Sequence, residues 1–272
     1  MLPILSISVV LYHNDPQELK ELVANILNSS IRIKLYLVDN SSTDQLNMKH
    51  QGGDVEYIHN GKNIGYGAGH NIAIRLSLES GFKYHLVMNP DISFGPLTLE
   101  KIYAFMEEHP EVGQLMPRIL YVDGTIQPLC KLLPTPFDLI GRRFFKNAEW
   151  AKRRNQKYEL EGFNYDKIIN TPSLSGCFMF LRNDVLKKSG LFDQRYFMYL
   201  EDYDLTRRIH QHSETIFYPG AEVLHGYKKE SYVNKTLLKY HIASAIKYFN
   251  KWGWILDTER THLNRRTSKQ IQ

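Results

Sequence analysis

The chain has 272 residues, enough to bury the core of one large domain or two small ones. Hydrophobic residues make up 43% and charged residues 23%, values that exclude a largely disordered chain. No run approaches the roughly 18 apolar residues of a membrane-spanning helix. The first residues lack the basic segment and cleavage site of a signal peptide, so we expect a strand there. Cys130 and Cys177 lack metal or redox spacing, which favours free thiols in a cytosolic protein.

The net charge of +5 is unevenly distributed along the chain. Residues 228–272 carry ten Lys and Arg against three Asp and Glu, whereas the remaining residues have a small acidic excess. Seven more Lys and Arg lie within residues 142–157, opposed by Glu149 alone. Such patches indicate an anionic surface nearby, whether lipid, nucleic acid or a phosphate-bearing substrate, although solvated helix faces have the same composition.

Strands and helices alternate over the first 120 residues. Apolar runs predict strands over residues 4–12, 34–38, 55–59, 84–88 and 112–121. Helical spacing of apolar side chains predicts helices over residues 16–30, 68–80 and 97–108, the first of them capped by Asp15 and opened by Pro16. This alternation predicts an α/β fold with a mostly parallel sheet covered by helices.

The pattern is less regular after residue 120. Residues 129–170 are interpreted as an irregular excursion over the active face rather than a second domain. The segments that follow are predicted as a strand at 175–182, a helix at 183–189, an aromatic loop at 190–200, a helix at 201–212, and edge strands at 215–218 and 222–224. A last helix at 233–252 has an apolar stripe that packs on the domain, lies in an anionic membrane interface, or does both.

Polar residues follow three of the predicted strands, at Asp39-Asn40, Asn63 to Gly65 and Asn89 to Asp91. Because the C-terminal ends of parallel strands share an edge, we expect these residues to cluster. Asp39 could accept a hydrogen bond from the imide N–H of a pyrimidine base, although a turn or a helix cap explains it equally. Pro90 ends the strand before it and presents Asp91 on a stiff turn. A β-turn without any further role is the commonest use of an Asn-Pro-Asp sequence.

The glycine-rich segment from Asn63 to Gly69 lets the backbone approach a ligand closely. It resembles the dinucleotide-binding fingerprint, but that fingerprint directly follows the first strand and has an acidic residue about 20 residues later. Here the glycines follow the third strand. We therefore do not expect a nicotinamide- or methyl-donor-binding Rossmann domain.

The second half of the chain supplies further acids and one histidine. Glu201 and Asp202 begin a predicted helix, where carboxylates complement the helix dipole. Two adjacent acids beside an aromatic loop also offer a general base and a partner that positions it. His225 ends a predicted strand and is either structural or, together with Asp91, part of a hard-metal site that a diphosphate completes.

Taken together, these motifs resemble family 2 glycosyltransferases. The nucleotide-sugar half of that family is similar to Val9 to Tyr12, Val38 to Ser42, Asn63 to Gly67, Asn71, and Asn89 to Asp91. Its acceptor half is similar to Ser175 to Phe178, Gly190 to Asp193, Phe197 to Asp204, and His225. The resemblance covers about residues 4–252, and within the family it is strongest to bacterial rhamnosyltransferases of O-antigen and capsule assembly.

The resemblance implies a GT-A fold, a Rossmann-like sheet flanked by helices, and inverting transfer from a nucleoside-diphosphate sugar with Mg²⁺ or Mn²⁺. Asp202 would be the base with Glu201 supporting it, and Asp91 and His225 would be metal ligands. Donor-binding residues would be Leu11, Tyr12, Asp39, Asn40, Asn63, Gly65, Asn71, Asn89 and Asp91. The usual Asp-x-Asp motif is here Asn89-Pro90-Asp91, a variant of the rhamnosyltransferase-like branch, so we expect rhamnose from dTDP-rhamnose.

The implied domain spans residues 1–230, with a nucleotide-sugar half at 1–120 and an acceptor half at 121–230, followed by a helix and basic tail at 231–272. Expected partners are the donor, a lipid-linked oligosaccharide acceptor and an anionic surface on the cytoplasmic side of the plasma membrane; a homodimer is left open. Alternatives are a UDP-sugar donor or a non-catalytic nucleotide- or polysaccharide-binding module. Only the basic tail suggests nucleic acid, and no reading motif accompanies it.

Overall fold

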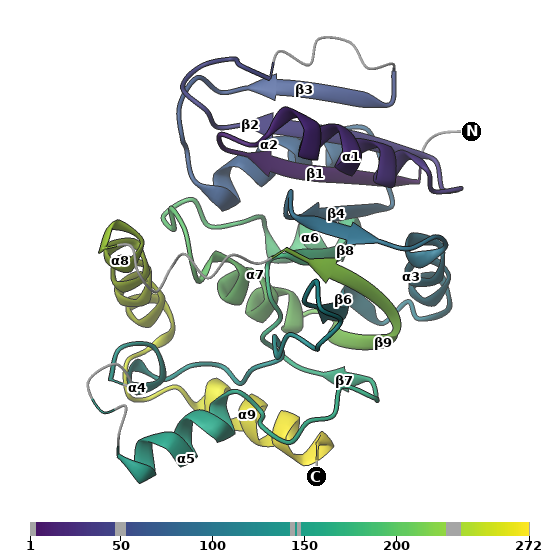
Figure 1. Ribbon diagram of the computed structural model, residues 1–272. Helices are drawn as coiled ribbons and strands as arrows, with labels where there is room; N and C mark the ends of the chain where they lie inside the picture. Colours follow the sequence, from purple (N-terminus) through teal and green to yellow (C-terminus); the bar gives the residue numbers. More distant parts are fainter. Residues whose placement is uncertain (1–3, 47–52, 142–144, 146–147, 227–234, 272) are drawn as a thin grey trace.

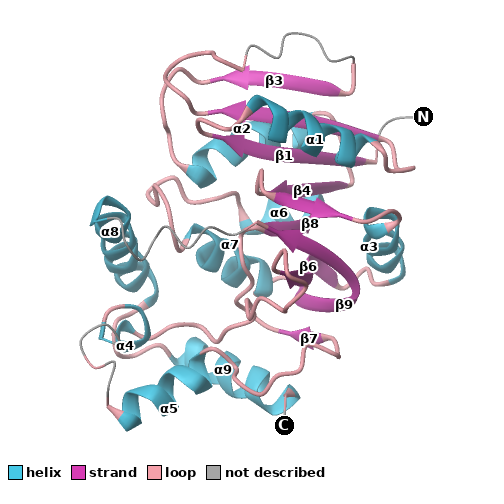
Figure 2. Ribbon diagram, in the orientation of Figure 1, coloured by secondary structure: helices cyan, strands magenta, loops and turns pink. Residues whose placement is uncertain are grey.

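The computed structural model describes residues 4–46, 53–141, 145, 148–226 and 235–271. Within these residues, one nine-stranded sheet forms the centre, with strand order β3-β2-β1-β4-β8-β6-β9-β5 and β7 paired to β9 outside this path. Helices cover both faces of the sheet, and α4, α5 and α9 gather beside β7, at the end of the molecule opposite β3 (Figure 1 and Figure 2).

The first half of the chain follows the predicted alternation. Its strands are β1 (Leu5–Leu11), β2 (Ile33–Asp39), β3 (Val55–His59), β4 (Tyr84–Met88), β5 (Ile92–Phe94) and β6 (Val112–Leu120). Its helices are α1 (Pro16–Leu27), α2 (Tyr66–Glu79) and α3 (Thr98–Glu108). Asp15 caps α1 by accepting from two backbone N–H groups, and Pro16 takes the first helical position, as predicted. Strand β5 is new, because three residues are too few to show a periodic pattern.

The second half contains more regular structure than the sequence predicts. Its elements are α4 (Pro136–Leu139), α5 (Glu149–Tyr158), β7 (Ile169–Asn170), β8 (Phe178–Arg182), α6 (Asn183–Ser189), α7 (Glu201–His210), β9 (Glu214–His225), α8 (Lys235–Trp252) and α9 (Thr258–Gln270). Residues 129–170 thus hold two helices and a short strand. Arg142, Arg143 and Lys146 of the basic group, and the predicted start of the last helix at Val233, lie outside the described residues.

The sheet is mixed. Strands β3, β2, β1 and β4 are parallel, β8 runs antiparallel between β4 and β6, and β9 is parallel to β6. The prediction of two separate edge strands is wrong, because both segments belong to one strand, β9. This strand pairs with β6 on one side and with β5 and β7 on the other. Pro219 and Gly220, which separate the two segments in the sequence, lie at a register shift of β9 opposite Pro117 and Arg118 of β6.

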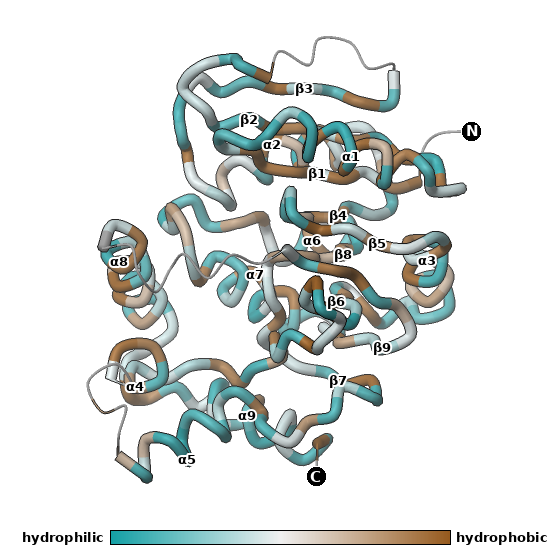
Figure 3. The backbone as a smooth tube through the Cα atoms, viewed as in Figure 1, coloured by the Kyte–Doolittle hydropathy of each residue, from teal (hydrophilic) through white to brown (hydrophobic). Residues whose placement is uncertain are grey.

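Alternation along the strands sends apolar side chains to both faces of the sheet. Ile7 and Val9 of β1 lie in the core cluster that contains the buried residues of α1 and α3. On the other face, Val10 packs with Ala73 of α2, and Val87 of β4 packs with residues of α6 and α7. In Figure 3 the strands are largely brown, whereas α5 and α9 are largely teal. Burial on both faces explains why the strands read as continuous apolar runs.

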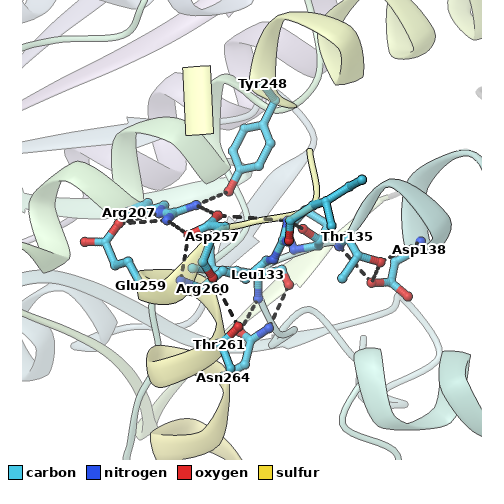
Figure 4. A network of polar contacts seen from close by, with 12 residues as sticks. Leu133, Thr135, Asp138, Arg207, Tyr248, Asp257, Glu259, Arg260, Thr261 and Asn264 are labelled. Atoms are coloured by element: carbon cyan, nitrogen blue, oxygen red, sulfur yellow. Dashed lines mark hydrogen bonds and ion pairs between the residues drawn. The ribbon is translucent and has the colours of Figure 1, made fainter. Parts of the chain in front are cut away.

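The two C-terminal helices pack on the rest of the chain. The apolar stripe predicted for the first of them is buried in part: Ala245 and Phe249 of α8 are inaccessible, whereas Ile242 is 38% exposed. Helix α9, which occupies the predicted basic tail, is held by Arg207 of α7, whose guanidinium binds both Asp257 and Glu259 (Figure 4). Among the described residues, no helix combines the length and apolar content needed to cross a membrane.

A chain of buried polar side chains lies beneath α2. The hydroxyls of Ser6 and Ser8 each lie 2.8 Å from a ring nitrogen of His85, and Ser8 also lies 2.7 Å from His70 Nδ1. All four side chains are inaccessible to solvent. Burial lowers the pKa of His85 to about 3 and the pKa of His70 well below its ordinary value. Both rings are therefore neutral at neutral pH.

The free energy of unfolding should fall as the pH drops below about 6.5, because unfolded histidines take up protons that the folded rings exclude. Each histidine contributes a slope approaching about 1.4 kcal/mol per pH unit. The variant His85→Gln removes one such group, so its slope between about pH 5.5 and 4 should be shallower by that amount. Urea denaturation of both proteins over a pH series measures this, and equal slopes would contradict a neutral buried His85.

Candidate active site

Five of the predicted site residues line one pocket of about 1040 Å³: Asn89, Asp91, Glu201, Asp202 and His225. The pocket lies at the ends of β4 and β9 and at the N-terminus of α7. It therefore lies between the C-terminal end of β4, in the first half of the chain, and the carboxyl groups of Glu201 and Asp202, in the second half. Tyr66, and residues 175–177 between β7 and β8, complete much of its wall.

The pairing of β5 with β9 brings Asp91 and His225 together. Ile92 is the register partner of His225, and the N–H of Gly226 donates to the carbonyl of Asp91 at 2.9 Å. Asp91 Oδ1 then lies 3.4 Å from His225 Nε2. The side chain of Asp91 is 41% exposed, whereas the imidazole is nearly buried. The turn at Pro90 thus places one carboxylate at the sheet edge with a histidine beside it.

Gln127, which belongs to no sequence motif, fixes the orientation of this imidazole. Its Nε2 donates to the backbone carbonyl of His225 at 3.0 Å, so its Oε1 faces His225 Nδ1, 2.9 Å away. An amide oxygen only accepts, and Nδ1 therefore carries the proton. On the other side, Asn89 Nδ2 lies 3.4 Å from His225 Nε2 and can only donate. Nε2 is consequently the basic nitrogen, and it faces Asp91.

Asp91 Oδ1 and His225 Nε2 are two electron-pair donors 3.4 Å apart, an arrangement that a cation stabilises. Ligands about 2.1 Å from Mg²⁺ on neighbouring octahedral positions lie about 3 Å apart, so the pair fits such an ion with little movement. Within the described residues, no three His, Cys, Asp or Glu side chains gather closely enough to hold a metal ion. The described side chains of these types thus supply an incomplete set of ligands.

Glu201 and Asp202 open α7 after a strained turn. Tyr199 and Leu200 have φ values of 71° and 67°, left-handed conformations that cost of order 1–3 kcal/mol each and concentrate at functional sites. The N–H of Gly176 donates to Asp202 Oδ2 at 2.8 Å. A Cβ at position 176 would lie 3.0 Å from Asp202 Cβ, so the glycine allows the backbone to hold this carboxylate.

Burial raises the pKa of both carboxyl groups. For Glu201 the pKa lies well above its ordinary value, because the group is desolvated and lies near the negative Asp202. Its Oε2 has no hydrogen-bond partner among the described residues. For Asp202, burial is again the main cause, while the N–H groups of Gly176 and Tyr203 lower the pKa in part. Asp202 is therefore the better stabilised anion of the two and the better placed proton acceptor.

The donor-binding residues predicted near the end of β2 lie outside this pocket. Asp39 is buried, and its two oxygens accept from the Ser41 N–H and the Tyr57 hydroxyl. Asn40 is also buried and donates to the carbonyl of Gly65 at 3.2 Å, so it holds the glycine-rich loop. Two further predicted donor-binding residues lie at the end of β1: Leu11 belongs to the core, whereas Tyr12 is 54% exposed.

The glycine-rich loop joins the two halves of the chain. Gly65 has a φ of 94°, and a Cβ there would lie 2.4 Å from the carbonyl oxygen of Phe197. Asn63 accepts from the Gly65 N–H and so shapes the loop. Asn71 is buried and bonds both the N–H and the carbonyl of Phe192. Both amide atoms of Asn71 thus bond the backbone of the loop at Phe192, and its predicted role in donor binding stays a prediction.

Tyr66 lines the pocket and is a further residue to which the sequence motifs assign no role. Its hydroxyl lies 3.0 Å from Asn89 Oδ1 and 2.7 Å from the carbonyl oxygen of Gly176. It therefore links the turn that carries Asp91 to the segment that holds Asp202. Its position in the sequence, directly after Gly65 and at the N-terminus of α2, is the feature from which its role in the site could have been predicted.

Replacing the buried carboxylate of Glu201 should stabilise the protein. A carboxyl whose folded pKa is raised destabilises the fold increasingly as the pH rises above its unfolded value, so Glu201→Gln should be more stable at neutral pH. We expect the melting temperature to rise by roughly 2–4 °C for each kcal/mol gained. The exposed Glu108→Gln on α3 is the control and should leave it unchanged. A lower melting temperature for Glu201→Gln would contradict the assigned charge penalty.

Comparison with known sequences identifies relatives. The model of the family described as Glycosyl transferase family 2 matches residues 6–190. The N-acetylglucosaminyl-diphospho-decaprenol L-rhamnosyltransferase of Mycobacterium tuberculosis is 27% identical over 241 residues, which cover 83% of this chain and 76% of that protein. The rhamnosyltransferase WbbL of Escherichia coli is 24% identical over 261 residues, which cover 88% of this chain and 90% of that protein.

Solved structures show the same fold. GalNAc-T7 with UDP, GalNAc and Mn²⁺ superposes with a TM-score of 0.65 at 14% identity, over 93% of this chain and half of that one. The mannosyltransferase PcManGT from Pyrobaculum calidifontis with GDP-Man and Mn²⁺ gives a TM-score of 0.57 at 17% identity, over 91% and 65% of the two chains. The predicted GT-A fold is confirmed, and the chain belongs to glycosyl transferase family 2.

Proposed function

We propose that this protein transfers a sugar, with rhamnose from dTDP-rhamnose as the best candidate, to a hydroxyl of a lipid-linked glycan, with inversion at the anomeric carbon. The observation that carries the proposal is that Asp202 and the Asp91–His225 pair line the same pocket. Two relatives named as rhamnosyltransferases support the choice of sugar. Assembly of a cell-surface polysaccharide such as O-antigen or capsule is the corresponding process.

Asp202 is assigned as the base that accepts the proton of the acceptor hydroxyl. Its raised pKa brings it closer to the operating pH than an ordinary aspartate, which favours proton transfer in the transition state. Glu201 supports it, because a buried neighbour that resists ionisation leaves the negative charge of the pair on Asp202. Attack by the hydroxyl on one face of the sugar while the diphosphate leaves from the other gives inversion.

Asp91 and His225 are assigned as ligands of Mg²⁺ or Mn²⁺. A divalent ion supplies charge neutralisation for the departing diphosphate. The oxygen of Asp91 and the nitrogen of His225 suit such an ion, and Gln127 keeps the correct nitrogen of the imidazole toward it. Since the described side chains of these types supply only this pair, diphosphate oxygens and water would complete the coordination.

The end of β2 and the glycine-rich loop are assigned to the nucleotide. Asp39 has a second lone pair on each oxygen with which to accept from the base, and the exposed ring of Tyr12 offers a stacking surface. Asn40, Asn63 and Gly65 would act by holding the loop. In this division residues 1–120 bind the donor, residues 121–230 form the acceptor side, and residues 231–272 place the protein at the cytoplasmic face of an anionic membrane.

Removing the base tests the proposed chemistry. Asp202→Asn should lower the rate of sugar transfer to a lipid-linked acceptor by about 10²–10⁴-fold, because the hydroxyl loses its proton acceptor. Nucleotide affinity should stay within about threefold, since the substitution leaves the donor side intact. Release of dTDP followed by chromatography, with calorimetric titration of dTDP, measures both. The control is the exposed Asp166→Asn, and full activity in Asp202→Asn would refute the assigned base.

Metal binding is testable without turnover. Asp91→Ala should abolish the Mn²⁺-dependent part of dTDP affinity, because it removes one of two protein ligands. Gln127→Ala should weaken that affinity by about 10–100-fold, since the imidazole of His225 loses its fixed tautomer. Electron paramagnetic resonance of free Mn²⁺ in the presence of dTDP reports binding directly, with the exposed Gln156→Ala as the control. If chelation and Asp91→Ala both leave dTDP affinity unchanged, the metal role is wrong.

A further inference from the structure

A second pocket of about 670 Å³ lies between α5 and α9, against residues 132–135. Five cationic side chains and one acidic side chain line it: Arg154, Lys157, Arg260, Arg265 and Lys269, with Asp138. Asp138 is 7% exposed and is already paired with Arg154 at 3.0 Å. The pocket is therefore strongly positive and has no part in the proposed chemistry.

Three of these cations have no described counter-ion. Lys157, Arg265 and Lys269 are exposed and make no ion pair or hydrogen bond through their side chains within the described residues. Arg260 is instead buried and donates to the backbone carbonyls of Pro134 and Ile255. Its role is to join the walls, while the other three are left to face a ligand.

The walls of the pocket are held rigidly. Asn264 of α9 pairs with Leu133 through two hydrogen bonds, one to its N–H and one to its carbonyl. Behind them, Arg207 is 1% exposed and binds Asp257 and Glu259 at the start of α9 (Figure 4). A buried ion pair of this kind is costly to break, by roughly 3–5 kcal/mol. The pocket is thus formed before any ligand arrives.

Exposed apolar side chains border the positive pocket. Ile255 and Leu256, directly before α9, are 86% and 89% exposed, and Arg260 ties the carbonyl of Ile255 to the pocket wall. Trp150 of α5 is 54% exposed and packs on Phe137, over which the guanidinium of Arg154 also lies. A positive pocket bordered by exposed aliphatic and aromatic side chains matches the interface of an anionic bilayer.

We propose that the α5–α9 pocket and its apolar border form the membrane-binding surface of this protein, with the cations taking the phosphates of anionic phospholipids and Ile255 and Leu256 entering the acyl boundary. The proposal rests on the membrane location in the proposed function and names the surface responsible. Single-stranded nucleic acid also offers phosphates, but sites that bind it combine cations with aromatic rings on which the bases stack. Here the two most exposed border residues are aliphatic.

Vesicle flotation of the full chain tests this surface. The native protein should bind phosphatidylcholine vesicles that contain about 30% phosphatidylglycerol and should not bind pure phosphatidylcholine. The triple variant Lys157→Gln, Arg265→Gln, Lys269→Gln should bind about 100-fold more weakly, since each lost cation costs about fivefold. The matched control Lys20→Gln, Lys101→Gln, Lys188→Gln loses the same net charge from exposed positions on α1, α3 and α6 and should bind almost normally. Equal loss in the two triple variants would overturn the proposal.

The apolar border is tested separately. Leu256→Ser should weaken vesicle binding by about tenfold and should do so at high salt too, because the lost contact is apolar. The control is Val122→Ser, because Val122 lies just after β6 and is also highly exposed, at 76%. Binding of inorganic phosphate that depends on the three cations, without vesicle binding, would assign the pocket to a free phosphate. Cation-dependent binding of single-stranded RNA without vesicle binding would assign it to nucleic acid, and either result overturns the lipid assignment.

Transfer to a water-soluble acceptor analogue separates this surface from the active site. The cation triple variant should transfer at the native rate in solution while failing on vesicles that carry the acceptor. If neither the native protein nor any variant turns over nucleotide sugar, the proposed function fails while the vesicle results still stand. If the variant loses transfer in solution as well, the pocket belongs to the acceptor site and the membrane assignment is wrong.

Discussion

The site depends on one contact between halves that are distant in the sequence: the start of α2 against the aromatic loop of residues 190–200. Asn71 bonds the backbone of Phe192 on both sides, and Gly65 lets the carbonyl of Phe197 approach its backbone. Tyr66 then donates its N–H to that same carbonyl. A buried amide that satisfies a backbone N–H and carbonyl together is expensive to remove, because both groups would be left unpaired in the core. This contact positions the N-terminus of α7, so that it lines the same pocket as the end of β4.

The electrostatic character of the pocket follows from that placement. Burial raises the pKa of both Glu201 and Asp202, and the left-handed backbone at Leu200 directly precedes them. Strain and buried charge both cost stability, so a sequence retains them only where packing elsewhere compensates. The opposite wall is built differently, since Asp91 is open to the pocket and its partner His225 is held by amide groups. One pocket is therefore lined by an acid pair, Glu201 buried and Asp202 half-buried, and by the exposed Asp91 beside a nearly buried imidazole. The first pair suits proton transfer and the second suits cation binding.

The sequence predicts what is local and misses what depends on tertiary pairing. The strands and helices of the first half and the strand-end motifs follow from periodicity and turn chemistry, and Asn89 and Asp91 lie where these rules place them. Strand β5 and the role of Gln127 escape such rules, because a three-residue strand has no period and a single buried amide has no motif. Asn71 shows the same limit: a polar residue after a glycine-rich loop suggests a ligand contact, and nothing in the local sequence indicates its bond to the backbone of Phe192, 121 residues away.

In the C-terminal region, folding brings together basic residues that are far apart in the sequence. Helix α9 is too hydrophilic to predict from an apolar stripe, and its attachment relies on the buried guanidinium of Arg207, which binds two acids and lies 4.1 Å from the ring of Trp252. In the sequence, the basic groups at 142–157 and 228–272 are separate, and each alone is compatible with a solvated helix face. The fold brings Lys157 of the first group beside Arg265 and Lys269 of the second. Like charges repel at such closeness, so their convergence in one preformed pocket is better explained by an anion that they share than by solubility.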